Sequence, residues 1–162
     1  MFELAPVDFT DKPAAYAQLN RQLASLLDGE TDFIANAANT SALLWHALPG
    51  LNWVGVYRAV AGQLVLGPFQ GKPACVRIAI GKGVCGTAAA SRRTIVVPDV
   101  QAFPGHIACD AASRSEIVVP LLDQERLLGV LDLDSPALGR FDEADQAGLE
   151  AIAQLLVAKS QL

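Results

Sequence analysis

The 162-residue sequence predicts a single α+β domain, in which a mostly antiparallel six-stranded sheet carries the N- and C-terminal helices on one face. Two segments with helical apolar spacing occupy the first fifty residues, and a third occupies the last twenty. Short apolar runs separated by glycine-containing turns fill the region between them. The length suits one domain, and the sequence shows neither an internal repeat nor a low-complexity tract.

Three long helices are predicted from apolar residues at helical spacing. The first spans about 13–27, with Asp11 as its cap and Pro13 in its first turn. The second spans 32–48 and is ended by Pro49-Gly50. We expect its inward residues to be Ile34, Ala37, Leu44 and Leu48. The last helix begins near Asp142, and its apolar face comprises Leu149, Ile152, Ala153, Leu156 and Val157.

The strands are predicted between these helices. Segments 52–59 and 63–69 form an antiparallel hairpin whose short turn contains Gly62. Further strands are expected at 76–80, 94–97, 116–122 and 126–134, with a short helix at 85–91. Residues 99–115 lose the pattern and form a long ordered loop, which in a compact domain is usually functional or mobile. The expected organisation is one domain over 1–162, with helices in 1–50, the sheet and its loops in 51–135, and a helix in 142–160.

Composition excludes several classes of function. Hydrophobic residues make up 52% of the chain, and its net charge of −5 argues against binding of nucleic acid or of an anionic membrane surface. No apolar run approaches the roughly 20 residues of a membrane span. The start, MFELAPVDFTDKPAA, lacks the features of a signal peptide, so the cytoplasm is the expected location.

Carboxylates on the last predicted strand are candidate acids. Because side chains alternate along a strand, Asp132 and Asp134 share one face, and Leu131 and Leu133 share the other. Two carboxylates roughly 7 Å apart under an apolar cover hold a proton more tightly, which supplies a general acid at neutral pH. Glu116 opens a strongly apolar strand and is a third candidate. The alternative is an outer face of ordinary solvated acids.

Aromatic residues offer a candidate pocket wall. Trp53 and Tyr57 point the same way on the first strand, and Gly55 between them leaves room beside the rings. The alternative is ordinary core packing.

Three cysteines, Cys75, Cys85 and Cys109, fall within 35 consecutive positions. An odd number in an unsecreted chain argues against a disulfide framework. Inert buried thiols, a metal site and redox chemistry therefore remain open. Cys85 stands where a helix begins, and electrostatics alone selects it as the most activated thiol. A zinc site would use Cys75, Cys85, His106 and Cys109, but the chain has no Cys-x2-Cys knuckle, and we expect no bound metal.

Five segments resemble the free methionine-(R)-sulfoxide reductases, which are single GAF domains: GPFQGKPAC (67–75), GKGVCGTA (81–88), VPDVQAFPGHIACD (97–110), SEIVVP (115–120) and GVLDLDS (129–135). The resemblance runs from about Leu51 to the last helix, and the first fifty residues match in helical pattern only. It implies that Cys109 attacks the sulfur of free L-methionine (R)-sulfoxide and becomes a sulfenic acid. Cys75, or alternatively Cys85, then forms a disulfide with it, which thioredoxin reduces with NADPH as the distant electron source. No bound cofactor is implied.

The resemblance also implies roles for the pocket residues. Glu116 and Asp134 address the sulfoxide oxygen, Asp132 pairs with the substrate ammonium, and Trp53 covers the S-methyl group, with Tyr57 as a further pocket residue. We expect the substrate carboxylate to meet backbone N–H groups near 116–118, and the family indicates a homodimer. Two alternatives remain: a stand-alone GAF sensor of a small ligand, and a thiol redox sensor that turns over no sulfoxide.

Overall fold

A computed structural model describes residues 4–107 and 110–161. In chain order these form α1 (Lys12–Leu26), α2 (Phe33–Ala47), β1 (Trp53–Val60), β2 (Gln63–Gly71), β3 (Arg77–Ala79), α3 (Gly83–Ser91), β4 (Ile95–Val97), the 3-10 turn η1 (Val100–Ala102), β5 (Ser115–Asp123), β6 (Arg126–Ser135) and α4 (Glu143–Ala158). Every strand pair is antiparallel, in the order β3-β2-β1-β6-β5-β4. The predicted α+β class and each predicted element are confirmed, with ends shifted by at most two residues.

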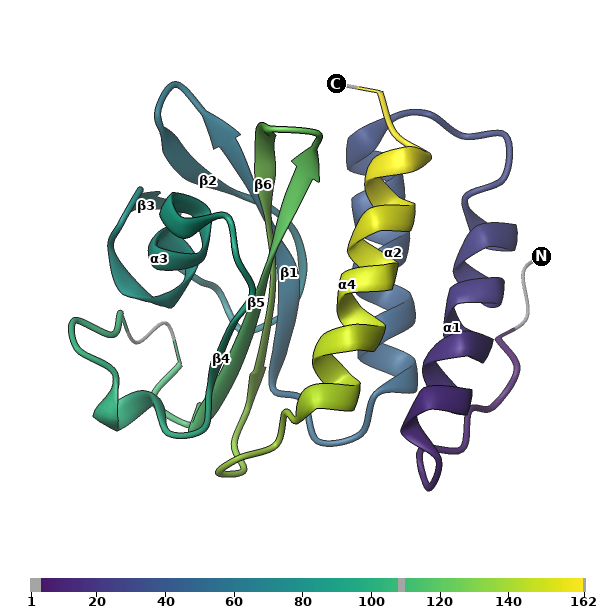
Figure 1. Ribbon diagram of the computed structural model, residues 1–162, viewed down its shortest axis with the longest axis horizontal. Coiled ribbons are helices and arrows are strands. Elements are labelled where there is room, and N and C mark those ends of the chain that lie inside the picture. Colours follow the sequence, from purple (N-terminus) through teal and green to yellow (C-terminus); the bar gives the residue numbers. More distant parts are fainter. Residues whose placement is uncertain (1–3, 108–109, 162) are drawn as a thin grey trace.

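The sheet has a helical side and a side that carries loops (Figure 1). α2 and α4 pack on the sheet, and α1 packs mainly on α4 as an outer layer. α3 and the segment that follows β4 cover the opposite face. The prediction that the terminal helices occupy one face is confirmed. Among the described residues, no helix combines the length and the apolarity that a bilayer crossing requires.

Local sequence explains where the helices begin. Asp11 accepts a hydrogen bond from the Ala14 N–H at 3.2 Å, and Asp32 accepts one from the Ala35 N–H at 2.8 Å. Asp142 caps α4 in a reciprocal capping box with Asp145. These caps satisfy amide groups that have no partner inside the first helical turn.

A buried charge network joins α1 to α4. The Asp145 carboxylate is fully buried and accepts hydrogen bonds from Tyr16 Oη at 2.9 Å and from Arg140 Nη1 at 3.1 Å, as well as from Lys12 Nζ. The backbone N–H of Asp142 donates to the same carboxylate at 3.0 Å. Four donors therefore surround one carboxylate, which makes its burial tolerable.

The apolar core lies between the sheet and the helices. Leu131 and Leu133 of β6 pack there against α2 and α4. The prediction that Ile34 faces inward is wrong, because its side chain is 42% exposed. Phe33 and Ala37, one helical turn apart, define the buried face of α2, so the residue after Phe33 is rotated toward solvent.

Candidate active site

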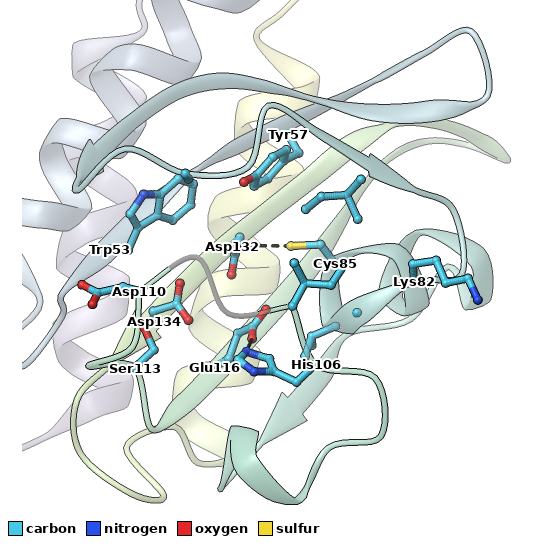
Figure 2. A pocket seen from close by; sticks show the side chains of 15 residues that line it. Trp53, Tyr57, Lys82, Cys85, His106, Asp110, Ser113, Glu116, Asp132 and Asp134 are labelled. Carbon is cyan, nitrogen blue, oxygen red and sulfur yellow. Dashed lines mark hydrogen bonds and ion pairs between the residues drawn. The ribbon is translucent and has the colours of Figure 1, made fainter.

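A small cavity, open at its mouth, lies on the sheet face opposite α2 and α4 (Figure 2). Residues of α3 and of the segment after η1 line it. Its lining includes Trp53 and Tyr57 from β1, Cys85 from α3, Glu116 from β5 and two aspartates from β6; the other lining residues are Ala74, Ile78, Lys82, Gly83, Val84, His106, Ile107, Asp110 and Ser113. The predicted pocket residues within the described chain are thus brought together.

Three carboxyl groups form one wall of the cavity. Asp132 and Asp134 share the cavity face of β6, as strand alternation predicts. Glu116 lies directly opposite Asp134 in the β5–β6 register. Glu116 and Asp132 are only 5% and 7% exposed, so the alternative of a solvated acidic face is wrong for them.

Burial makes these groups weak acids. The pKa of Glu116 is raised well above its usual value by burial and then by the charge of Asp134. The pKa of Asp132 is raised by burial and by Glu116, and the pKa of Asp134 by burial and by Asp132. The three groups titrate as a cluster, which therefore retains protons at a pH where exposed carboxyl groups are ionised.

Cys85 is not an activated thiol. It is the third residue of α3, and its Sγ donates to Asp132 Oδ2 at 3.3 Å. Burial raises its pKa well above the usual value, and the neighbouring Asp132 and Glu116 raise it further. This corrects the electrostatic ranking made from the sequence. The N-terminus of a helix favours a thiolate by about 1 kcal/mol, which desolvation and two nearby carboxylates outweigh.

The aromatic pair forms the opposite wall, as Figure 2 shows. The Trp53 ring stacks on Tyr57 and on Phe69, with centroid distances of 5.9 and 5.3 Å. A Cβ on Gly55 would lie 2.6 Å from Trp53 Cη2, so the glycine leaves the space that the ring occupies. The pocket interpretation of Trp53 and Tyr57 is therefore the one that the structure supports.

The same aromatic residues hold the segment that carries Cys75. Trp53 Nε1 donates to the Lys72 carbonyl at 3.1 Å, and Tyr57 Oη donates to the Cys75 carbonyl at 3.0 Å. Cys75 is half-buried and directly follows the lining residue Ala74 in the chain. Cys109, the predicted nucleophile, lies outside the described residues.

Polar residues that the sequence did not assign to the pocket complete the site. His106 Nε2 lies 3.5 Å from Glu116 Oε2, and burial lowers the pKa of this imidazole. Asp110 pairs with Lys72 Nζ at 3.2 Å and accepts a hydrogen bond from Asn52 Nδ2 at 3.3 Å. The sequence signal that could have assigned Asp110 and His106 to the pocket was their closeness to Cys109 in the chain. Sequence reasoning weighed His106 only as a zinc ligand, because its contact with Glu116 depends on the fold.

Two expectations about ligands change with the structure. The backbone of Glu116–Val118 pairs with β4 on one side and β6 on the other, so its N–H groups are engaged in the sheet and do not face a substrate carboxylate. Among the described residues, the metal-capable group is Cys85, Glu116 and Asp132, whose ligand atoms lie within 4.8 Å of one another. It shares only Cys85 with the zinc set considered from the sequence.

Chemically, the site combines buried carboxyl groups that keep their protons, an aromatic wall and the buried thiol of Cys85. A protonated carboxyl group donates a hydrogen bond to an oxygen that gains charge, and a flat ring covers an apolar substituent. An ionised carboxylate in the same cavity attracts a cation. The cavity thus suits a small molecule that bears an ammonium group, a polar oxygen and an apolar end.

Comparisons with known proteins agree with this description. The model of the GAF domain family matches residues 22–158. A curated relative from Escherichia coli, named free methionine-R-sulfoxide reductase, is 54% identical over 146 residues, which cover 90% of this chain and 88% of the relative. The structure of free methionine-R-sulfoxide reductase from Neisseria meningitidis in complex with its substrate superposes with a TM-score of 0.93 at 47% identity, covering 98% of this chain and 95% of that one. A putative GAF sensor protein from Burkholderia vietnamiensis has a TM-score of 0.89 at 59% identity, covering 93% and 96%.

Proposed function

The chain belongs to the GAF domain family and, within it, to the free methionine-R-sulfoxide reductases, and from this premise we propose that it reduces free L-methionine (R)-sulfoxide to L-methionine. The observation that carries the proposal is the pairing of Glu116 with Asp134 on adjacent strands. Both carboxyl groups have raised pKa values, and both line a cavity whose other wall is Trp53.

The protonated carboxyl groups assist the chemical step. A sulfoxide oxygen accepts charge and a proton as its bond to sulfur breaks, so an acid within hydrogen-bond reach accelerates the reaction. Glu116 and Asp134 supply this acid, and Trp53 covers the S-methyl group. The position of the methyl group relative to the oxygen then selects the R epimer.

Asp132 supplies the counter-charge for the substrate ammonium. Its Oδ1 atom is buried without a hydrogen-bond partner among the described groups, which suits a cationic group of a ligand. Methionine sulfoxide within a protein has no such ammonium, and a buried carboxylate left unpaired costs several kcal/mol. The pocket therefore favours the free amino acid.

The thiols supply the two electrons that reduce the sulfoxide to the thioether. The Cys109 thiolate attacks the substrate sulfur, the oxygen is transferred to the cysteine, and methionine leaves a sulfenic acid behind. A second thiol condenses with the sulfenic acid, a disulfide forms and water is released. Thioredoxin reduces the disulfide, with NADPH as the source of its electrons.

Cys75 is the better candidate for the second thiol. It is half-buried, whereas Cys85 is 4% exposed and donates a hydrogen bond to Asp132. Attack requires a thiolate and access, and Cys85 has neither in this state. Thioredoxin also has to reach a sulfur of the disulfide, which favours the more exposed residue.

The test is NADPH consumption with thioredoxin and thioredoxin reductase, supplied with either the (R)- or the (S)-sulfoxide of free methionine. Turnover of the R epimer alone, with methionine formed in proportion, supports the proposal. Cys109→Ser should abolish turnover and retain ligand binding. Absence of turnover on both epimers would favour a stand-alone GAF sensor, and peroxide-driven disulfide formation without turnover would favour a thiol redox sensor.

The homodimer belongs to the same proposal. Small side chains line a shallow groove between α1 and α4, among them Ala17, Ala144, Ala147 and Ala151. Such a face lets helices from two copies approach closely. Light scattering of the purified chain distinguishes a dimer from a monomer.

A further inference from the structure

Three buried side chains from three different elements place metal-ligating atoms together in the cavity. Cys85 Sγ, a Glu116 carboxylate oxygen and an Asp132 carboxylate oxygen all lie within 4.8 Å of one another. They come from α3, β5 and β6, which the fold brings together (Figure 2). Cys85 Sγ and Asp132 Oδ2 are 3.3 Å apart.

These separations are close to those that zinc requires. Bonds of ~2.3 Å to sulfur and ~2.1 Å to oxygen in a tetrahedral site put the ligand atoms ~3.4–3.6 Å apart. The Cys85–Asp132 pair already meets this distance within a few tenths of an ångström. The remaining pairs, at up to 4.8 Å, have to shorten by about 1 Å for all three atoms to bind one ion.

An independent observation points to a cationic ligand at the same place. Asp132 is 7% exposed, and its Oδ1 atom lacks a hydrogen-bond partner among the described groups, although the side chain lines the cavity. A buried acceptor without a hydrogen-bond partner destabilises the folded state, and a cation bound to this oxygen removes that cost.

The donor set selects the type of cation. A thiolate with two carboxylates carries three negative charges when ionised, and a dication neutralises most of them. Soft sulfur favours Zn²⁺ and similar thiophilic ions, whereas Mg²⁺ and Ca²⁺ prefer sites made of oxygen alone.

We propose that Cys85, Glu116 and Asp132 form a binding site for a thiophilic divalent cation of the zinc class, and that the bound cation closes the pocket to substrate. Binding displaces the proton on Cys85 Sγ and the protons that the Glu116 and Asp132 carboxyl groups hold; these protons are released to solvent, and no atom changes oxidation state. The block rests on the proposed function, because Asp132 and Glu116 are the groups assigned there to the substrate. The site thus makes the enzyme sensitive to zinc-class ions.

The first experiment detects the metal–sulfur bond directly. In the Cys75→Ser/Cys109→Ser variant, Cys85 is the one remaining thiol of the chain. Titration of this reduced variant with Co²⁺ should produce a thiolate-to-cobalt charge-transfer band that saturates at one equivalent. Adding Cys85→Ser should abolish the band. A titration of the double variant without a band overturns the site.

The second experiment tests the carboxylates. Competition with a chromophoric zinc chelator measures affinity in Glu116→Gln, in Asp132→Asn and in Glu125→Gln, a matched control on the exposed β5–β6 turn. Loss of a ligand should weaken Zn²⁺ binding by ~10-fold or more, since loss of an outer-shell contact alone costs ~10–100-fold. The control should leave the affinity unchanged, and Mg²⁺ should not compete. Equal affinities in all three variants overturn the assignment.

The third experiment tests the block on the prereduced chain without thioredoxin, because thioredoxin thiols also bind zinc. Zn²⁺ should inhibit single-turnover release of methionine competitively with the sulfoxide, and a chelator should restore it. Non-competitive inhibition would mean that the cation binds outside the substrate pocket, and it would overturn the proposed site. If the chain releases no methionine even without metal, the proposed function fails and the first two experiments still decide the metal site.

Discussion

Replacing Asp132 by asparagine is expected to stabilise the fold at neutral and alkaline pH while it abolishes reduction of methionine sulfoxide. The carboxyl group is 7% exposed, and one of its oxygens has no hydrogen-bond partner among the described groups. Asparagine has the same shape and no charge to desolvate. The variant therefore separates what the residue does for substrate binding from what its ionisation costs the fold.

The sign of the effect follows from the raised pKa of Asp132, which burial causes first and Glu116 second. In the unfolded chain the group titrates at about 3.9. Above that value the folded state binds more protons than the unfolded state, so stability falls as pH rises. The stabilising contribution of the protonated group is complete below the unfolded pKa and is lost as pH rises through the folded pKa. In the Asp132→Asn variant residue 132 cannot ionise, so this loss of stability at high pH does not occur.

The expected gain at alkaline pH is about 2 kcal/mol. Replacing a buried ion pair by apolar residues of similar volume is often neutral or stabilises proteins by roughly 1–4 kcal/mol, and removing the charge of Asp132 removes the same kind of desolvation cost. The lower half of that range applies here, because Cys85 donates to Asp132 Oδ2 and Glu116 shares the titration. For a chain of this size, 2 kcal/mol corresponds to a rise in Tm of about 4–8 °C.

Urea unfolding of the reduced protein at about pH 5 and about pH 8 measures the effect. Glu125→Gln, on the exposed turn after β5, is the matched control and should change stability little at either pH. The gain for Asp132→Asn should be larger at the higher pH. A gain that is the same at both values, or a loss at the higher one, would refute the argument that ionisation of this carboxyl group destabilises the fold.

Three further outcomes are expected. Glu116→Gln should lower kcat by about 10²–10⁴-fold and remove the decline of kcat at alkaline pH, since the variant has lost the acid; an unchanged pH–rate profile would contradict this. Asp145→Asn should lower the free energy of unfolding by about 3 kcal/mol, because the three of its four donors that point at Oδ2 then face an amide nitrogen, whereas the exposed Asp28→Asn should change it by less than about 1 kcal/mol; equal values in urea unfolding would show that the buried network contributes nothing. Gly55→Ala should cost about 1–3 kcal/mol and raise KM, because the new Cβ meets Phe69 Cβ and lies 2.6 Å from Trp53 Cη2, so that the Trp53 ring and the Phe69 strand have to move apart; an unchanged KM would contradict the place of the Trp53 ring in the substrate pocket.

Strand periodicity is the most informative signal in the sequence. The alternation of Leu131 and Leu133 with Asp132 and Asp134 correctly predicts two residues in the core and two in the cavity. Side-chain alternation is a property of the strand backbone, so it does not depend on which elements pack against the strand. Gly55 is informative for the same reason, because residues two apart on a strand share a face and Gly55 therefore lies between the Trp53 and Tyr57 side chains.

Properties that depend on packing between elements were not predictable. Whether Cys85 is acidic or inert depends on Glu116 and Asp132, which reach it from two other elements of the fold. The engagement of the 116–118 backbone depends on β4, which pairs along that segment. Local patterns indicate which face a residue occupies, but they do not show what lies opposite it.

The β5–β6 pair explains how an acidic pocket and a stable fold coexist. Glu116 lies directly opposite Asp134, an arrangement of like groups that destabilises a strand pair when both are ionised. The neighbouring residues Ile117 and Leu133, also directly opposite one another, are fully buried on the helical side of the same two strands. Each strand therefore contributes apolar burial on one face, which offsets the cost of the carboxyl groups on the other. Because the two contributions alternate along one backbone, the strands that anchor the core also fix the acids at the spacing that keeps them protonated.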